Sequence, residues 1–310
     1  MKNKPIVGVD VSKEWLDLCL AGQTKVERIA NEAGSIGTWL DRVRPGLVAF
    51  EPTGGYERAL TSAARERDIP LLRVHPNKVI AFRNAQGIKA KTDKLDARLI
   101  AAFAGERTNR RQPSILGNDR LRALAARRRQ LVAMLQAERC RRALAATGDV
   151  RESLDLLIAT LKQNRELLEG KIEETIAADP QTAHLARLLR TIHGIGPITA
   201  ATLIADLPEL GHLNAKQIAS LVGLAPQTRQ SGKTSYRAAT GHGRPQLRQV
   251  LFNAARSAIR CSSPFKTFYD RLVGDNQRPG KVALVAVMRK LLVTANAVAR
   301  DQQPWKFNAA

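Results

Sequence analysis

Aromatic residues are scarce in this sequence, making up 4% of its 310 residues. Domains that bind single-stranded nucleic acid stack bases on aromatic side chains, so this shortage argues against that mode of binding as the main one. Cysteine is also scarce, and Cys19, Cys140 and Cys261 lie far apart in the chain. These cysteines and the scattered histidines have neither the spacing of zinc ligands nor that of a disulfide framework. We therefore expect a protein of a reducing compartment that lacks a zinc site.

Long apolar segments are missing as well. No apolar run reaches the roughly 18 residues that a membrane-spanning helix needs. The charged stretch from Met1 to Lys13 leads directly into a strand pattern, which is not how a signal peptide continues. These features predict a cytoplasmic, nucleoid-associated protein with no membrane partner.

Basic residues, by contrast, are in large excess. The chain has 50 Lys and Arg against 28 Asp and Glu, a net charge of +22. The excess is spread along much of the chain, which favours a polyanionic partner, and nucleic acid is the commonest one. Phosphate contacts by Arg and Lys are then expected to dominate binding. The alternative is a basic soluble protein without such a partner.

The first third of the chain, residues 1–112, is expected to form an α/β domain. Short apolar runs predict strands at residues 6–10, 15–20, 25–30, 47–51 and 69–74. Helical patterns are expected at residues 36–43, 56–67, 76–85 and 93–105. Short connections between the first three strands indicate a meander, and the later alternation of helix and strand favours a mixed sheet.

The pattern changes after Pro113. Leucines recur at heptad-like spacing through residues 113–183, with a break near Gly148, and predict an antiparallel coiled-coil hairpin. Its first helix carries Arg127, Arg128 and Arg129, which could form a solvated face or an arm that binds phosphates or a second protomer. Residues 184–310 are expected to form a mainly helical domain that ends in a buried helix at residues 281–299.

Four carboxylates have positions that suggest a shared site. Asp10 and Glu51 each end a predicted strand, and Asp93 and Asp96 lie three residues apart at the start of a predicted helix. Clustered carboxylates require a cation, and their oxygens suit Mg²⁺ or Mn²⁺. Alternatively, Asp93 is a helix cap and Glu51 a residue of a surface turn.

Two glycine-containing segments in the last third suggest contacts with a nucleic-acid backbone. His193, Gly194 and Gly196 lie in a pattern typical of a helix-hairpin-helix motif, which binds phosphate through backbone N–H groups. A plain helical hairpin is the alternative. The second segment is a basic loop that is expected to lead into a helix and to grip a phosphate backbone. Its basic residues are Lys233, Arg237, Arg244 and Arg248.

The triplet Gly232-Lys-Thr234 looks like the end of a phosphate-binding P-loop. The leading glycine of that motif would fall at Gln227, and no strand is predicted before the segment, so ATP binding is rejected. Tyr236 and Tyr269 could suggest a tyrosine recombinase. Such enzymes lack a carboxylate tetrad, which makes this interpretation a poor one.

Three motifs resemble those of the DEDD-type transposases of the insertion-sequence "one-ten" family, which includes the Piv DNA invertases. They are Gly8-Val-Asp-Val-Ser-Lys13, Glu51-Pro-Thr-Gly-Gly-Tyr56 and Lys91-Thr-Asp-Lys-Leu-Asp-Ala-Arg98. The resemblance implies an RNase H-like N-terminal domain similar to the junction resolvase RuvC. It also implies that Asp10, Glu51, Asp93 and Asp96 are the metal-binding tetrad.

The resemblance extends to the C-terminal half. Gly223-Leu-Ala-Pro226, followed by Ser231 and Gly232, looks like the corresponding element of the family's transposase-twenty domain. It implies that Ser231 is a nucleophile that forms a phosphoserine link with DNA, with Thr234 and Ser235 as nearby alternatives. It further implies donor and target double-stranded DNA, a guide (bridge) RNA, and a homodimer or tetramer.

Two other functions remain open from the sequence. The first is a RuvC-like hydrolytic endonuclease, in which water attacks the DNA and Ser231 has a structural role. The second is a non-enzymatic protein that packages RNA or DNA through its basic arm. The carboxylates at positions 10, 51, 93 and 96 favour an enzyme over this second alternative.

Overall fold

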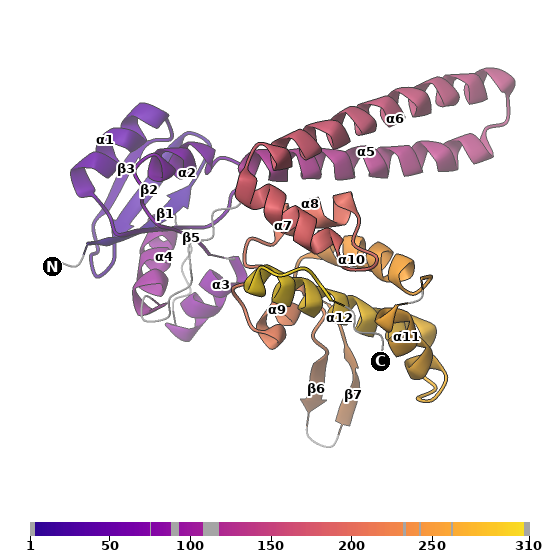
Figure 1. Cartoon of the computed structure of the whole chain (residues 1–310). Helices are drawn as coiled ribbons and strands as arrows, with labels where there is room; N and C mark the ends of the chain where they lie inside the picture. Colours follow the sequence, from indigo (N-terminus) through magenta and orange to yellow (C-terminus); the bar gives the residue numbers. More distant parts are fainter. Residues whose placement is uncertain are drawn as a thin grey trace. The chain divides into compact units, whose positions relative to one another are not determined.

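The computed structural model describes residues 4–74, 76–87, 93–107, 118–231, 234–241, 243–261 and 263–306. The chain divides into two compact units, Met1–Leu116 and Gly117–Ala310 (Figure 1). Each unit has its own hydrophobic core. The two units are described separately below.

A five-stranded mixed sheet forms the centre of the first unit. Its strands are β1 (Ile6–Val11), β2 (Trp15–Leu20), β3 (Val26–Ala30), β4 (Leu47–Phe50) and β5 (Leu71–Arg73). Their order is β3-β2-β1-β4-β5, with β2 antiparallel to both neighbours and β1, β4 and β5 parallel. This order confirms the expected mixed sheet of an RNase H-like domain.

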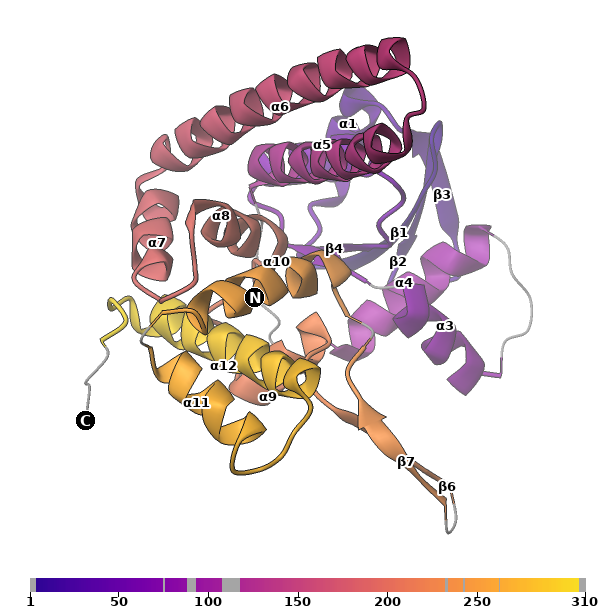
Figure 2. The ribbon, with the colours of Figure 1, turned by 90° about the vertical axis from the view of Figure 1, so that its right-hand side faces the viewer.

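Helices cover both faces of this sheet (Figure 2). One face packs on α1 (Ala33–Val43) and α2 (Arg58–Arg65), where Val9, Phe50 and Leu60 belong to one buried cluster. The other face packs on α3 (Pro76–Ala85) and α4 (Asp93–Arg107), where Ala49 and Ile100 share a second cluster. Because side chains alternate along a strand, consecutive residues of β1 and β4 serve the two layers in turn.

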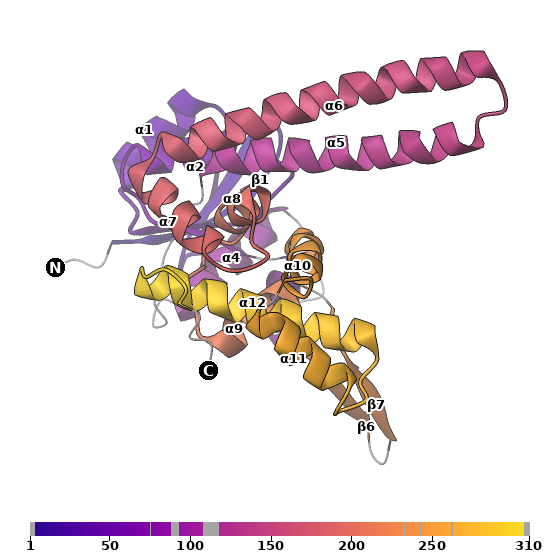
Figure 3. The ribbon, with the colours of Figure 1, turned by 45° about the vertical axis from the view of Figure 1, so that its right-hand side comes forward.

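In the second unit, α5 (Asp119–Leu144) and α6 (Gly148–Ala177) form the expected antiparallel hairpin (Figure 3). Its outer part is held together by a cluster that includes Leu135 and Leu161. At its base, Leu121 and Ile172 pack against Ala205 of α8 (Pro197–Asp206), so the hairpin belongs to the second unit. The remaining helices are α7 (Pro180–Arg190), α9 (Ala215–Val222), α10 (Pro245–Ala258), α11 (Pro264–Val273) and α12 (Gly280–Asp301).

Helix α12 is the core helix of the second unit. Its side chains Val287, Leu291 and Ala295 are fully buried in a cluster shared with α7, α8, α9 and α10. Within the described residues it is the one helix whose length and composition would also allow it to cross a membrane. The sequence interpretation overlooked this possibility, but the packing accounts for the apolar composition of α12 as part of a protein core.

A β-hairpin occupies the segment that was expected to be a basic loop. Strands β6 (Gln227–Ser231) and β7 (Thr234–Ala239) pair antiparallel and extend away from the helices of their unit (Figure 2). The expectation of a loop was wrong because the segment lacks the alternation of apolar and polar residues that marks a half-buried strand. Its strands form a two-stranded sheet of their own.

The packing of α4 on β1 depends on Gly8. A Cβ atom at this position would lie 2.2 Å from the backbone N of Ala101 and 2.4 Å from the O of Ala97. We expect Gly8→Ala to lower the free energy of unfolding of the first unit by about 1–3 kcal/mol or more, because a helix backbone must move. Gly105→Ala on the same helix is the control, since its Cβ would meet its nearest atom at 3.6 Å. Equal urea midpoints for the two variants would contradict this account.

Candidate active site

Two of the predicted carboxylates lie at the same edge of the sheet. In the parallel pairing of β1 with β4, Val9 is opposite Phe50. Asp10 and Glu51 are the next residues along these two chains, so they occupy equivalent positions at the carboxyl ends of neighbouring strands. Neighbouring strands are about 4.8 Å apart, which brings the two residues close together.

The direction of α4 brings its first turn to this same edge. Ala97 and Ala101 lie against Gly8 in the middle of β1, whereas Gly105 lies beside Ala21, whose N–H bonds to Ile6 O at the start of β1. Helix α4 therefore runs antiparallel to β1, and its N-terminus points towards the carboxyl end of that strand. Asp96 is partly buried in this first turn, and Asp93 begins the helix with a side chain outside the described part of the structure.

The side chains also share a face of the sheet. Gly8 faces α4, and Asp10 lies two residues further along the same strand, hence on the same face. Ala49 contacts the α4 layer, and Glu51 follows two residues later as β4 ends. The tertiary structure thus brings Asp10, Glu51 and the first turn of α4 together.

A fifth carboxylate lies beside them that the sequence interpretation missed. Asp17 of β2 is directly opposite Asp10 in the antiparallel register, and it is 4% exposed. Both oxygens of Asp17 accept hydrogen bonds from Arg28 of β3, at 2.9 and 2.7 Å. Charged residues are rarely buried without a partner, so an Asp inside the apolar strand 15–20 was the available signal.

The donor set at this edge fits a hard divalent cation. Carboxylate oxygens are the usual ligands of Mg²⁺ and Mn²⁺, and Arg28 is the ion-pair partner of Asp17. Among the described side chains, no group of three or more His, Cys, Asp or Glu residues could hold a metal ion. Asp93, whose side chain is not described, is the remaining candidate ligand at this edge.

The loop that follows Glu51 is held by Glu57. This carboxylate is 6% exposed and accepts hydrogen bonds from the backbone N–H groups of Thr53 and Gly55, at 3.3 and 3.0 Å. It also forms a 2.7 Å ion pair with Arg73 of β5. Burial pushes the pKa of Glu57 upward, but these N–H groups and Arg73 outweigh it, so the net pKa is lowered. The loop is thereby fixed to the neighbouring strand.

Asn31 connects this loop to the one that follows Asp10. Its Nδ2 donates to the backbone O of Ser12 at 2.8 Å and to that of Tyr56 at 2.9 Å. The two carboxylate-bearing strand ends are therefore joined by one side chain. Asn31 and Glu57 thus hold the loops that follow Asp10 and Glu51.

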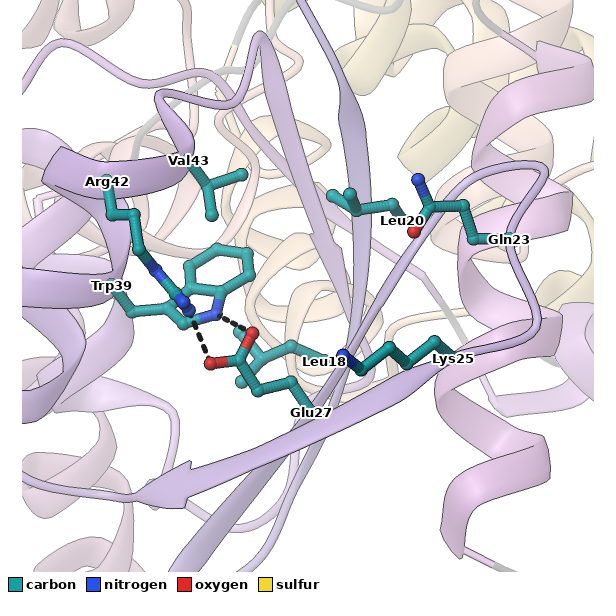
Figure 4. A pocket seen from close by; sticks show the side chains of 8 residues that line it. All are labelled: Leu18, Leu20, Gln23, Lys25, Glu27, Trp39, Arg42 and Val43. Carbon is teal, nitrogen blue, oxygen red and sulfur yellow. Dashed lines mark hydrogen bonds and ion pairs between the residues drawn. The ribbon is translucent and has the colours of Figure 1, made fainter.

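Trp39 lines a separate cavity of about 300 Å³ on the other side of the sheet (Figure 4). Within it, Glu27 accepts hydrogen bonds from Trp39 Nε1 and from Arg42. Its lining residue Leu18 belongs to the α1 and α2 layer, opposite the face occupied by Asp10. This cavity is therefore distinct from the carboxylate edge.

In the second unit, Ser231 is the last residue of β6 and lies opposite Thr234 across the hairpin. It is therefore at the tip of the hairpin, with a side chain outside the described part of the structure, as is that of Arg237 in β7. Gly232 and Lys233 are themselves outside the described residues. The structure thus places the backbone of the predicted nucleophile at an end of an extended element.

Several arginines predicted to bind nucleic acid are engaged within their own unit. Arg128 pairs with Glu169 at 2.6 Å, and Arg129 pairs with the buried Asp206 at 2.6 Å. Arg244 forms a bidentate pair with Glu209. Arg127 and Arg248 also have partners, namely the Gln130 side chain and the Val222 carbonyl.

The turn between α7 and α8 carries the glycine pattern from which a helix-hairpin-helix motif was predicted, and Gly194 has a packing role within it. Gly194 has a φ of +90°, and a Cβ there would lie 2.4 Å from the O of Ala254 in α10. His193 is exposed and packs edge-on against Trp305 with ring centroids 5.2 Å apart. Gly196 begins α8 with open space around it. Phosphate binding at this turn stays a prediction.

Comparison with known proteins identifies the family. A model for DEDD-type IS110 transposases, described as "Transposase", matches residues 7–147, and one described as "Transposase IS116/IS110/IS902 family" matches residues 186–270. The chain belongs to the IS116/IS110/IS902 transposase family. It is therefore an enzyme of DNA transposition and recombination. The two matched regions of this transposase contain the carboxylate edge and the β6–β7 hairpin respectively.

The chain is also similar to individual proteins. The transposase is 29% identical over 317 residues to the pilin gene-inverting protein of Moraxella bovis, covering 98% of each chain. It is 28% identical over 185 residues to an uncharacterized insertion element IS116 protein of Streptomyces clavuligerus, covering 58% of this chain and 42% of that one. A Thermus thermophilus RuvC bound to a Holliday junction substrate is similar at 20% identity and a TM-score of 0.27, covering 34% and 94% of the two chains.

The lowered pKa of Glu57 gives a pH-dependent prediction. The ionised carboxylate stabilises the first unit above its ordinary pKa of 4.5, and this stabilisation is lost as the pH falls through the lowered value. Glu57→Gln should therefore lower the free energy of unfolding by about 1–3 kcal/mol at neutral pH. This difference from wild type should shrink at acid pH. Urea unfolding followed by Trp15 and Trp39 fluorescence, in a Trp305→Phe background, measures this.

Glu66→Gln is the matched control, because Glu66 is an exposed carboxylate at the end of the same helix α2. It should leave the urea midpoint nearly unchanged at both pH values. A Glu57→Gln protein that differs from wild type by the same amount at neutral and acid pH would refute the assigned ionisation.

Proposed function

We propose that this transposase cuts and exchanges DNA strands with divalent metal ions, Mg²⁺ or Mn²⁺, held by Asp10, Glu51, Asp93 and Asp96. The observation that carries the proposal is the convergence of β1, β4 and the N-terminus of α4 at one sheet edge. Metal ions at such a site stabilise the charge that develops on the oxygens of a phosphodiester under attack. The protein's own contribution is to hold its carboxylates rigidly, through the contacts of Gly8, Asn31 and Glu57.

Ser231 is the proposed nucleophile. Its oxygen attacks the scissile phosphorus, a serine–phosphate ester forms, and the bond to the leaving deoxyribose oxygen breaks. The leaving oxygen takes up a proton, and the serine proton passes to solvent or to a nearby base. A hydroxyl of the second DNA strand then attacks the phosphoserine and releases Ser231. Each step exchanges one phosphoester for another, so no ATP is required.

The position of Ser231 supports this role, because the tip of an extended hairpin can enter a DNA-bound site that lies outside its own unit. The proposed substrates are donor and target double-stranded DNA, read with a guide RNA, and the proposed active form is a homodimer or tetramer. The net charge of +22 is compatible with binding both nucleic acids. The relatives named for pilin gene inversion support recombination between two DNA sites. Such a protein would act in the cytoplasm, at the nucleoid.

The carboxylates are tested by single substitutions. Asp10→Asn, Glu51→Gln and Asp96→Asn should each reduce Mg²⁺-dependent strand cleavage by at least about 100-fold, because each removes a charge from the metal site. Binding of the same DNA without metal should be unchanged. Glu14→Gln, an exposed carboxylate in the turn after Asp10, is the control and should cleave normally. Normal cleavage by the Asp10 and Glu51 variants would overturn the metal site.

The nucleophile is tested by trapping. Wild-type protein incubated with Mg²⁺ and labelled donor DNA should yield a covalent adduct that peptide mapping assigns to Ser231, and Ser231→Ala should yield none. Thr234→Val and Ser235→Ala, which remove the neighbouring hydroxyls, serve as controls and should retain the adduct. A Ser231→Ala protein that still cuts DNA would favour the hydrolytic, RuvC-like alternative.

A further inference from the structure

A group of charged residues lies where the β6–β7 hairpin joins the helices of the second unit. Arg244 is the residue before α10 and lies five residues after the end of β7. Its guanidinium donates two hydrogen bonds to Glu209, at 2.7 and 2.5 Å, and a third to the backbone O of Asp206 at 2.8 Å. Asp206 is the last residue of α8 and Glu209 lies three residues beyond it. Arg244 therefore holds the chain that leaves the hairpin against the C-terminal end of α8.

The chain that enters β6 and the chain that leaves β7 also pack against each other. Gly243 has a φ of +63°, and a Cβ there would lie 2.5 Å from the O of Leu221 and 2.6 Å from the N of Gly223. Arg248 donates to Val222 O at 3.1 Å, which adds a second connection between α10 and the end of α9. The chain before β6 and the chain after β7 are therefore packed together backbone against backbone, and the pair is fixed through Arg244.

The same group reaches the α5–α6 hairpin. Asp206 is 7% exposed, and its Oδ2 accepts a hydrogen bond from Arg129 of α5 at 2.6 Å. Arg122, about two turns before Arg129 in α5, donates a hydrogen bond to the backbone O of Ala205 at 3.3 Å. Leaving the buried Asp206 carboxylate without its arginine partners would destabilise the fold, so we expect these contacts to be maintained together. One connected network of hydrogen bonds thus runs from α5 through the end of α8 to Arg244, which lies between β7 and α10.

We propose that Arg244, Glu209, Asp206 and Arg129 form a clamp that positions the β6–β7 hairpin, and with it Ser231, relative to the α5–α6 hairpin. This inference rests on the proposed role of Ser231. It reassigns Arg129 and Arg244 from contacts with nucleic acid to positioning, because their guanidinium groups are already committed to carboxylates of their own unit. A ligand or second protomer that moves α5 would change the position of Ser231 through this clamp.

The test compares Glu209→Gln, Arg244→Lys and Arg244→Gln with a control, Arg142→Gln. Arg142 pairs with Asp155 on the exposed part of the α5–α6 hairpin, so its replacement removes the same charge far from the clamp. Hydrogen exchange of peptides spanning residues 225–241 reports the mobility of the hairpin directly. Trypsin cleavage after Arg229 and Arg237 gives an independent measure of the same motion.

We expect Glu209→Gln and Arg244→Gln to raise hydrogen exchange and trypsin cleavage of the hairpin at least about fivefold, and to slow formation of the Ser231 adduct by about tenfold. Arg244→Lys should restore part of the protection of the hairpin and part of the rate of adduct formation. DNA affinity and its salt dependence in Arg244→Gln should match those of Arg142→Gln, which removes the same charge. Circular dichroism of each variant verifies that the helices remain folded.

Two results would overturn the clamp. Unchanged hairpin exchange in Arg244→Gln would show that Arg244 does not hold this element. Weaker DNA binding than the control, with a salt slope reduced by about one, would make Arg244 a phosphate contact instead. A hairpin that loosens as expected, in a protein whose wild type forms no serine adduct, would support the clamp and reject the proposed nucleophile.

Discussion

The close approach of α4 to Gly8 is the contact on which the catalytic unit depends. Because glycine has no side chain, the helix backbone reaches the middle of β1, with Ala97 and Ala101 against the strand. The antiparallel course of α4 then brings its first turn to the strand end that carries Asp10. The strand ends that carry Asp10 and Glu51 and the first turn of α4 lie at one edge as a result, each attached to regular secondary structure. Such attachment limits their movement, which a preorganised metal site requires.

Charge pairing gives the protein much of its internal order. Asp17, Glu57 and Asp206 are all buried, and each accepts hydrogen bonds from an arginine on another element. Breaking such a pair is destabilising mainly because a buried charge is left alone. The large basic excess is therefore not simply a nucleic-acid-binding surface. Part of it pairs with buried carboxylates inside the fold.

The two units divide the proposed chemistry between them. The first carries the carboxylate edge, and the second carries Ser231 at the end of a two-stranded hairpin. The family match covers both regions. A nucleophile on an extended element suits an enzyme that must join different DNA strands in an assembled complex, because the hairpin can act on a site built elsewhere. The clamp around Arg244 would then determine how the hairpin is presented.

The sequence alone determined the regular elements of the first unit, the α5–α6 hairpin and the family, and it singled out the carboxylates at positions 10 and 51 as candidates. Apolar periodicity and local motifs carry that information, since both depend only on near neighbours in the chain. Tertiary structure decided the rest. The pairing of Asp17 with Asp10, the reach of Asn31 between two loops, and the burial of Arg129 and Arg244 in ion pairs join residues distant in sequence. The β6–β7 hairpin also escaped prediction, because its sequence lacks the apolar–polar alternation of a half-buried strand and backbone pairing leaves no trace in residue type.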